Sequence, residues 1–274
     1  MREIVIVKLG GSLITDKGRV STVRPQILAH LCAEIAAARE SMSEALLVAH
    51  GSGSFGHVAA QAHGFSAAGN HPVSNEGISQ TQAQAHRLHS YVFEALLSAG
   101  VASFSFSPAS AMVMNDARDA ELYQEPVVLA LDLGLVPVTF GDVVLDRSRR
   151  ASVCSTEAIL SALADGLPRE RYRIRRVLWM GRTDGVLGAS GQTIPIIDEH
   201  NVEAVLELVQ GAAATDVTGG MKLRVETAWR MARSGITSQI LNGLESGVLS
   251  RALRGEEGSG TRIEGLQAAA ATRS

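Results

Sequence analysis

The chain has 274 residues, of which 46% are hydrophobic and 4% aromatic, and its formal net charge is −3. This nearly balanced charge argues against a nucleic-acid-binding or membrane-surface protein, because such proteins usually carry a basic excess or a basic stripe. The length allows one large domain or two small ones. The N-terminus shows no signal peptide, and no apolar run is long enough to span a bilayer.

Cysteine usage indicates the compartment. The sequence contains two cysteines, Cys32 and Cys154, which are too few for a disulfide framework. No cluster of Cys and His residues predicts a metal site. We therefore expect a reducing, cytoplasmic location.

Lysine is scarce. Only three of the 25 basic residues are lysines, namely Lys8, Lys17 and Lys222, and the other 22 are arginines. A GC-rich genome, which favours arginine codons, is one explanation. The other is that lysine is kept only where the chemistry requires it.

Apolar runs and helical spacings alternate along the chain. This alternation predicts an α/β fold with a mostly parallel sheet. Strands are expected at 4–7, 45–49, 101–106, 136–140, 177–180 and 238–241, with a hairpin after 141 that turns near 147–150. Helices are expected at 25–39, 76–98, 127–133, 156–164, 202–209, 221–233 and 248–253.

Three glycine-rich turns are placed where phosphates could bind. KLGGS at 8–12 follows the first strand, HGSGSFGH at 50–57 follows the second, and DVTGGMK at 216–222 opens a helix. Glycine lets the backbone approach a phosphate, and a helix N-terminus offers free N–H groups and the positive end of a dipole. None of the three turns has the spacing of a P-loop or of a Rossmann fingerprint.

The first turn extended to Lys17 (KLGGSLITDK at 8–17), the other two turns and Gly141-Asp142 resemble the isopentenyl phosphate kinases of the amino acid kinase superfamily. The resemblance runs from about residue 3 to residue 263. It implies a three-layer αβα sandwich, usually a homodimer, that transfers the ATP γ-phosphoryl group to isopentenyl phosphate. It further implies one domain over 1–263, with an acceptor-binding lobe at about 1–140 and a nucleotide-binding lobe at about 141–263. A frayed tail is expected over 264–274.

The resemblance also assigns residues. It implies catalytic roles for Lys8, Lys17, His57 and Lys222, with His57 hydrogen-bonded to the phosphate of the acceptor. Acceptor binding falls to Gly51, Ser52, Gly53 and His57. Nucleotide binding falls to Lys8, Gly10, Gly11, Ser12, Gly53, Gly181, Arg182, Asp184, Gly219, Gly220 and Lys222. The implied ligands are ATP with Mg²⁺ and a small phosphorylated acceptor, with no nucleic-acid or membrane partner.

The chemistry agrees with these residue types. Phosphoryl transfer between two phosphates brings many negative oxygens together, so catalysis is mostly positioning and neutralisation. A compact ammonium reaches between two phosphates as a point charge, which a planar guanidinium does less well. All three lysines fall on predicted phosphate-facing segments, which favours the chemical explanation of their scarcity.

Three positions depart from the family pattern. Ser52 replaces the middle glycine of the second turn. Thr156 stands where the family has an aspartate that organises the lysines, and Glu157 compensates only if its side chain folds back. Arg182 replaces a usual carboxylate. These changes keep two alternatives open: a kinase for another small phosphate or phosphonate such as fosfomycin, and a catalytically weak ligand-binding relative.

Other polar residues have weaker assignments. His50 is expected to fix its loop by hydrogen bonding. Asp142 either orients a lysine or Mg²⁺, or caps a turn. The arginine-rich run at 169–176 is interpreted as a solvated face. Four further histidines are candidates for the acceptor site or ordinary surface residues: His63, His71, His86 and His89.

Overall fold

The computed structural model describes residues 1–65, 73–117, 119–212, 220–256 and 258–265. Its centre is a sheet of eight strands: β1 (Arg2–Leu9), β2 (Ala45–His50), β3 (Ser103–Ser105), β6 (Val136–Phe140), β9 (Tyr172–Gly181), β10 (Ile196–Ile197), β11 (Thr237–Asn242) and β12 (Thr261–Ile263). Their order is β10-β12-β11-β9-β1-β2-β6-β3. Neighbouring strands run parallel except β11 and β12, so the predicted mostly parallel sheet is confirmed.

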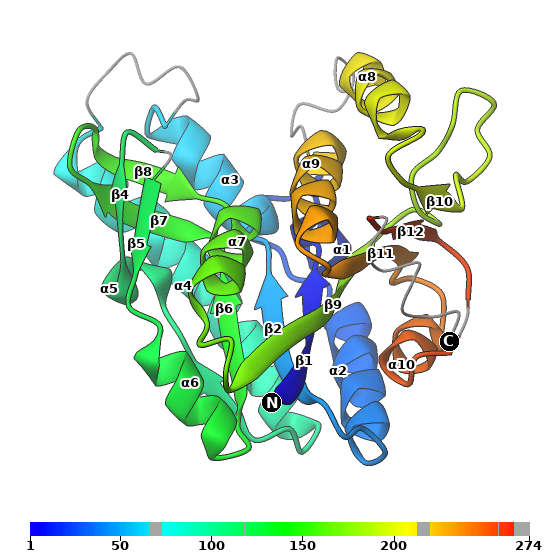
Figure 1. The fold of residues 1–274 in the computed structure, drawn as a ribbon. Coiled ribbons are helices and arrows are strands. Elements are labelled where there is room, and N and C mark those ends of the chain that lie inside the picture. Colours follow the sequence, from blue (N-terminus) through cyan, green and yellow to red (C-terminus); the bar gives the residue numbers. More distant parts are fainter. Residues whose placement is uncertain (66–72, 118, 213–219, 257, 266–274) are drawn as a thin grey trace.

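Helices cover both faces of this sheet (Figure 1). One face is covered by α6 (Glu125–Asp132), α7 (Thr156–Gly166), α8 (Val202–Ala212) and α9 (Gly220–Arg233). The other is covered by α2 (Pro25–Arg39), α4 (Asn75–Ser98) and α10 (Val248–Leu253), with the short α1 (Gly11–Ile14) and α3 (Gly53–Ala62) at one end. Each face has its own apolar core, so the predicted three-layer αβα sandwich is confirmed.

Strand β1 sets which way the site residues point. Ile4 and Ile6 pack into the core under α7 and α9, whereas Val5 and Val7 pack into the core under α2 and α4. Side chains of a strand alternate between the two faces of the sheet. Lys8 therefore continues the first series and extends toward α7 and α9.

A second, four-stranded sheet lies beside the first. It consists of β4 (Met112–Asn115), β5 (Asp119–Leu122), β7 (Asp142–Asp146) and β8 (Arg150–Cys154), in the order β5-β4-β7-β8, and α5 (Pro108–Ala111) precedes it. Strands β7 and β8 form the predicted hairpin, whose turn is held by backbone N–H groups that donate to buried Asp146. The sheet joins strands from both sides of residue 141, and the lobe boundary expected there stays a prediction.

Local signals determine several helix ends. Helix α2 begins at Pro25, and helices α4 and α7 follow Ser74 and Ser155, whose hydroxyls accept N–H bonds in the first turn. The predicted helices at 25–39 and 248–253 match α2 and α10 residue by residue. Among the described residues, no helix is long and apolar enough to cross a bilayer. Most of the predicted tail, residues 266–274, lies outside the described residues.

Candidate active site

Adjacent parallel strands end together at one edge of the central sheet. Leu9, at the end of β1, pairs with His50 of β2 on one side and with Met180 of β9 on the other. His50 in turn pairs with Phe140, the last residue of β6. The turns after these strands therefore meet along one edge, which is where ligands bind in open parallel sheets.

The first two glycine turns pack directly on each other. A Cβ atom at Gly11 would lie 2.5 Å from the Gly53 nitrogen, and one at Gly51 would lie 2.9 Å from the Gly11 nitrogen. Gly53 has a φ of +50°, in the left-handed region. Larger residues would push the turns apart, so these glycines are required by backbone contact as well as by any ligand.

A buried threonine joins the same two turns. The Thr15 hydroxyl donates to the Gly11 carbonyl over 2.7 Å and accepts the Ser54 N–H over 3.0 Å. Thr15 is 0% exposed. A hydroxyl that donates to one turn and accepts from the other fixes their spacing.

Lys8 ends β1 with a buried ammonium. The residue is 5% exposed, and its Nζ lies 2.9 Å from Oε1 of Glu157, which is itself buried in the first turn of α7. A Cβ at Gly51 would lie 3.8 Å from the same Nζ. The ammonium is therefore set between the carboxylate and the second glycine turn.

Burial and neighbouring charges shift both groups. Burial lowers the pKa of Lys8, with a further lowering by Arg224, while Glu157 opposes this shift. Burial alone would raise the pKa of Glu157, but the Lys8 ammonium and Arg224 hold it below its ordinary value. The stable arrangement is an ion pair beside a second cation, which leaves a net positive charge for an anion.

His57 belongs to the same electrostatic group. It lies one helical turn after Gly53 in α3. Desolvation lowers its pKa, and the positive charges of Lys8 and Lys17 lower it further while Glu157 raises it. Lys17 is exposed on the loop after α1. The structure thus brings three of the four predicted catalytic residues, Lys8, Lys17 and His57, to one place.

Thr156 and Glu157 together make the contacts that were expected of one aspartate. The Thr156 hydroxyl donates to the His50 carbonyl over 2.8 Å, so it ties α7 to the end of β2. Glu157 supplies the carboxylate to Lys8. The condition for compensation by Glu157 is met for Lys8, because the side chain of Glu157 folds back onto it.

Asp142 contacts a histidine and its own turn. Its Oδ2 lies 3.1 Å from Nε2 of His86, and its Oδ1 accepts the Val143 N–H. Burial raises the pKa of this carboxyl, and the Val143 N–H and His86 oppose the rise. Of the two roles predicted for Asp142, holding the turn is therefore the one that its contacts support. The described residues contain no group of three or more His, Cys, Asp or Glu side chains arranged to hold a metal ion.

Three of the predicted nucleotide-binding residues lie after β9 and in the first turn of α9. Arg182 and Asp184 are exposed after β9, and Oδ1 of Asp184 accepts from Asn242. Lys222, in the first turn of α9, donates to Gln210 over 3.0 Å and lies 3.7 Å from Glu226. The remaining members are Gly10, buried against the Met180 carbonyl, half-buried Gly11, Ser12 and Gly220, buried Gly181, and Gly219, which lies outside the described residues.

Comparison with known proteins identifies the fold family. The model of the amino acid kinase family matches residues 3–242. The isopentenyl phosphate kinase of Methanothermobacter thermautotrophicus is 33% identical over 96% of this chain and 99% of its own. The chain belongs to the amino acid kinase family.

Two further members of the amino acid kinase family are also similar to this chain. The isopentenyl phosphate kinase of Haloferax volcanii is 34% identical over 81% of this chain and 86% of its own. An X-ray structure of an isopentenyl phosphate kinase superposes with a TM-score of 0.76 at 28% identity, covering 95% of this chain and all of that one. The likeness to the Methanothermobacter thermautotrophicus enzyme and to this X-ray structure extends over nearly the full length of each protein.

Sequence reasoning missed two residues of this family site. Arg224 approaches the end of β9 so closely that a Cβ at Gly181 would lie 3.1 Å from its Nη1. It lies one helical turn after Gly220, a spacing that could have revealed it. Thr15 lies three residues after KLGGS, and no local pattern shows that its hydroxyl reaches the second turn.

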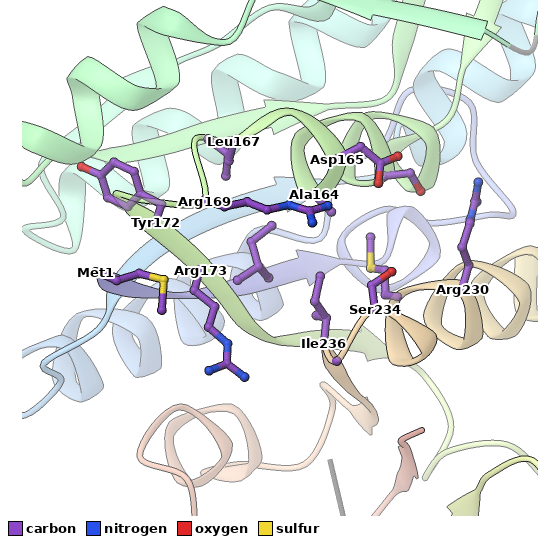
Figure 2. Close-up of a pocket in the computed structure, with 14 residues that line it drawn as sticks. Met1, Ala164, Asp165, Leu167, Arg169, Tyr172, Arg173, Arg230, Ser234 and Ile236 are labelled. Carbon is purple, nitrogen blue, oxygen red and sulfur yellow. The ribbon is translucent and has the colours of Figure 1, made fainter. Parts of the chain in front are cut away.

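A cavity of about 490 Å³ lies elsewhere, at the amino ends of the strands (Figure 2). Its floor includes Leu167 and Ile236, and Arg169, Arg173 and Arg230 line it. Helices α7 and α9 end beside it, and basic residues suit the negative end of a helix dipole. Arg173 and Arg175 are exposed and alternate with buried residues of β9, as a solvated face predicts, whereas Arg176 is half-buried and donates to the Leu253 carbonyl.

Proposed function

We propose that the chain transfers the γ-phosphoryl group of ATP to isopentenyl phosphate, giving isopentenyl diphosphate and ADP. Two curated isopentenyl phosphate kinases, which match 96% and 95% of this chain over nearly their own full length, support the proposal. The observation that carries the proposal is the buried Lys8 ammonium, set between Glu157 and the second glycine turn. A fixed cation beside backbone N–H groups suits the crowded oxygens of two phosphates.

Each residue then has a role in positioning or neutralisation. Lys8 holds the transferring phosphates, Lys17 stabilises charge on the transferred group, and His57 donates to the phosphate of the acceptor. Lys222 and Arg182 bind ATP phosphates. A general base is not required, because the attacking phosphate oxygen is ionised at neutral pH. Arg224, near Lys8 and Glu157, joins the cations that face the nucleotide.

The pair of Lys8 with Glu157 supports a working kinase over a catalytically weak relative. The weak alternative rested on the loss of a carboxylate at Thr156, and Glu157 supplies one. Arg182 is exposed and adds a cation on the nucleotide side.

Magnesium fits the proposed reaction as a partner of ATP. Mg²⁺ keeps several waters and is usually held by substrate phosphates with one or two carboxylates. Asp184 is the exposed carboxylate of the turn after β9, within the nucleotide-binding set. When bound, the ion would supply charge neutralisation to the phosphates, while the residues of the chain position them.

The lobe assignment, the homodimer and the cytoplasmic location are parts of the same proposal. Residues 1–140 would bind the acceptor and residues 141–263 the nucleotide. The homodimer follows from the resemblance, and light scattering on the purified protein tests it. Exposed Leu97, Leu129 and Leu133 provide apolar surface for such contacts.

A coupled assay of ADP release tests the function. We expect isopentenyl phosphate to stimulate ATP turnover well above background, with dimethylallyl phosphate and fosfomycin as competing acceptors. A larger specificity constant for fosfomycin would replace the proposed acceptor with a phosphonate. If none of the three stimulated turnover, the proposal would be wrong.

A further inference from the structure

A second polar cluster lies at the end of β2, on the face opposite to Lys8. Leu46 and Val48 of β2 pack into the core under α2 and α4, and His50 continues their series. Nε2 of His50 lies 3.1 Å from Nδ1 of His89 in α4, and Nε2 of His89 lies 2.7 Å from the hydroxyl of Ser105 in β3. The cluster is thus a chain of hydrogen bonds between three elements.

Phe140 holds the two imidazoles in place. The His89 ring stacks on Phe140 with centroids 4.2 Å apart, and the His50 ring lies nearly parallel to Phe140 at 5.5 Å. His50 is 0% exposed and His89 is 7% exposed. Burial is the main cause that lowers the pKa of His50 to about 3 and that of His89 to about 4, so both rings are neutral at physiological pH.

The Gly51 carbonyl, at one end of this chain of hydrogen bonds, determines which ring nitrogen of each histidine carries the proton. Nδ1 of His50 lies 3.1 Å from the Gly51 carbonyl oxygen, which can only accept. The proton of neutral His50 is therefore on Nδ1, and its Nε2 accepts from Nδ1 of His89. Nε2 of His89 in turn accepts from the Ser105 hydroxyl. Every bond of the chain runs in one direction, from Ser105 to the Gly51 carbonyl.

This direction matters because Gly51 belongs to the second glycine turn. In a trans peptide the N–H points opposite to the preceding carbonyl. The Gly51 carbonyl faces the histidine side, so the Ser52 N–H faces the other way. A Cβ at Gly51 would lie 3.8 Å from Nζ of Lys8, and among the described residues the Ser52 N–H has no backbone acceptor.

We propose that Ser105, His89 and His50 form a positioning chain that fixes the Gly51–Ser52 peptide with the Ser52 N–H turned toward the acceptor phosphate. The inference rests on the proposed function for the identity of that phosphate. The main chain of His50 is also fixed, because its carbonyl accepts from both Thr156 and Gly141. The imidazole is then the group that decides the orientation of the next peptide.

Two histidines of helix α4 hold two different turns in place. His86 precedes His89 by three residues, and it pairs with Asp142 after β6 while packing edge-on against Phe140. Residues three apart lie on the same face of a helix. One face of α4 therefore anchors the turn after β2 and the turn after β6.

Two variants at position 50, with a control at position 30, separate the hydrogen bond from packing. Asn and Leu have nearly the same shape, and the Asn side-chain N–H₂ replaces the Nδ1–H donor of His50, whereas Leu donates nothing. We expect H50L to raise the KM for isopentenyl phosphate about tenfold or more, because a charge-assisted bond is lost, with little change in the KM for ATP. H50N should recover most of this loss. H30L, at an exposed histidine of α2, is the matched control.

Nuclear magnetic resonance tests the chain independently of turnover. In protein labelled with ¹⁵N-histidine, we expect both His50 and His89 to carry their proton on Nδ1. Inorganic pyrophosphate should shift the Ser52 amide signal in the wild type and in H50N, and much less in H50L. A thermal melt of each variant establishes that it is folded.

The outcomes separate the two proposals. Absence of turnover with isopentenyl phosphate, together with the expected protons and a pyrophosphate-sensitive Ser52 amide, would reject the acceptor and keep the positioning chain. A proton on Nε2 of His50, or equal KM values for H50N and H50L, would overturn the chain while leaving the kinase assignment intact.

Discussion

The turns after β1 and β2 and the segments around β9 and α9 contribute to one edge of the sheet, but they are held in different ways. On the first side, Thr15 is fully buried and bonded to both turns, and Gly11 contacts Gly53 backbone to backbone. On the second side, Lys222 is half-buried and Arg182 and Asp184 are exposed.

The lysines of the two sides also differ in whether their partners are buried. Lys8 has a buried carboxylate partner at 2.9 Å, whereas Lys222 is bonded to an exposed amide and lies near the exposed Glu226. Exposed pairs of this type contribute about 0–1 kcal/mol to stability. The turns after β1 and β2, which we propose to bind the acceptor, are therefore organised before any ligand binds. On the proposed nucleotide side, Lys222 can exchange Gln210 for a phosphate with little loss of stability.

Lys8→Met tests the organised side most severely. We expect turnover to fall at least about 10²-fold, because a fixed charge at the reacting phosphates is lost. Stability should fall by about 3–5 kcal/mol, since Glu157 is left buried without its partner. Chemical denaturation and the coupled assay measure the two effects.

The double variant Lys8→Met/Glu157→Met separates these effects. Replacing a buried ion pair by apolar residues of similar volume is often neutral or stabilising, so stability should recover. Turnover should stay as low as in the single variant. Recovery of turnover together with stability would mean that Lys8 serves the fold alone.

His57→Ala tests whether the acceptor side binds the acceptor. We expect kcat/KM for isopentenyl phosphate to fall about 10- to 100-fold, the value of a hydrogen bond to a charged group. The KM for ATP should not change measurably. His63→Ala, at a histidine bonded to Gln80, is the control. An unchanged acceptor KM, or a loss confined to ATP, would contradict the assignment of His57.

Periodicity predicted the long elements well, because they are covered by apolar cores. Helix α2 and strand β6 agree with their predicted limits. Helix α3 was read only as a turn, since three of its first four residues, Gly53, Ser54 and Gly56, are weak helix formers. The second sheet was missed in part because β4 and β5 are four residues each, too short for a clear alternation.

In the candidate site too, residues on local motifs were predictable from the sequence, whereas their distant partners were not. The motifs located Lys8, Lys17 and His57, because each lies on a glycine-rich segment that joins a strand end. The partners of these residues come from distant parts of the chain: Glu157 reaches Lys8 from α7, and Arg224 approaches from α9. Such contacts depend on how the layers pack, which no local spacing encodes.

Lys222→Met examines the less organised side. We expect the KM for ATP to rise about tenfold, equivalent to about 1.4 kcal/mol, while the acceptor KM stays near its original value. The free energy of unfolding should change by no more than about 0.5 kcal/mol, because the bonds of Lys222 are exposed. A larger rise in the KM for the acceptor than in the KM for ATP would contradict the assignment of Lys222 to nucleotide binding.

The free energy of unfolding should also depend on pH through the buried His50. The pKa of His50 is lowered to about 3, below its ordinary value of 6.5, so the unfolded chain binds a proton that the folded chain refuses between these limits. Stability therefore falls as pH drops from about 6.5, by up to about 1.4 kcal/mol per pH unit for this residue. His50→Asn should make the slope of unfolding free energy against pH shallower by up to that amount. Above about pH 7.5 the two curves should run parallel, since neither state then holds the proton. Identical slopes below pH 6 would show that His50 titrates freely in the folded protein, and the buried hydrogen-bond chain would then no longer contain a neutral His50.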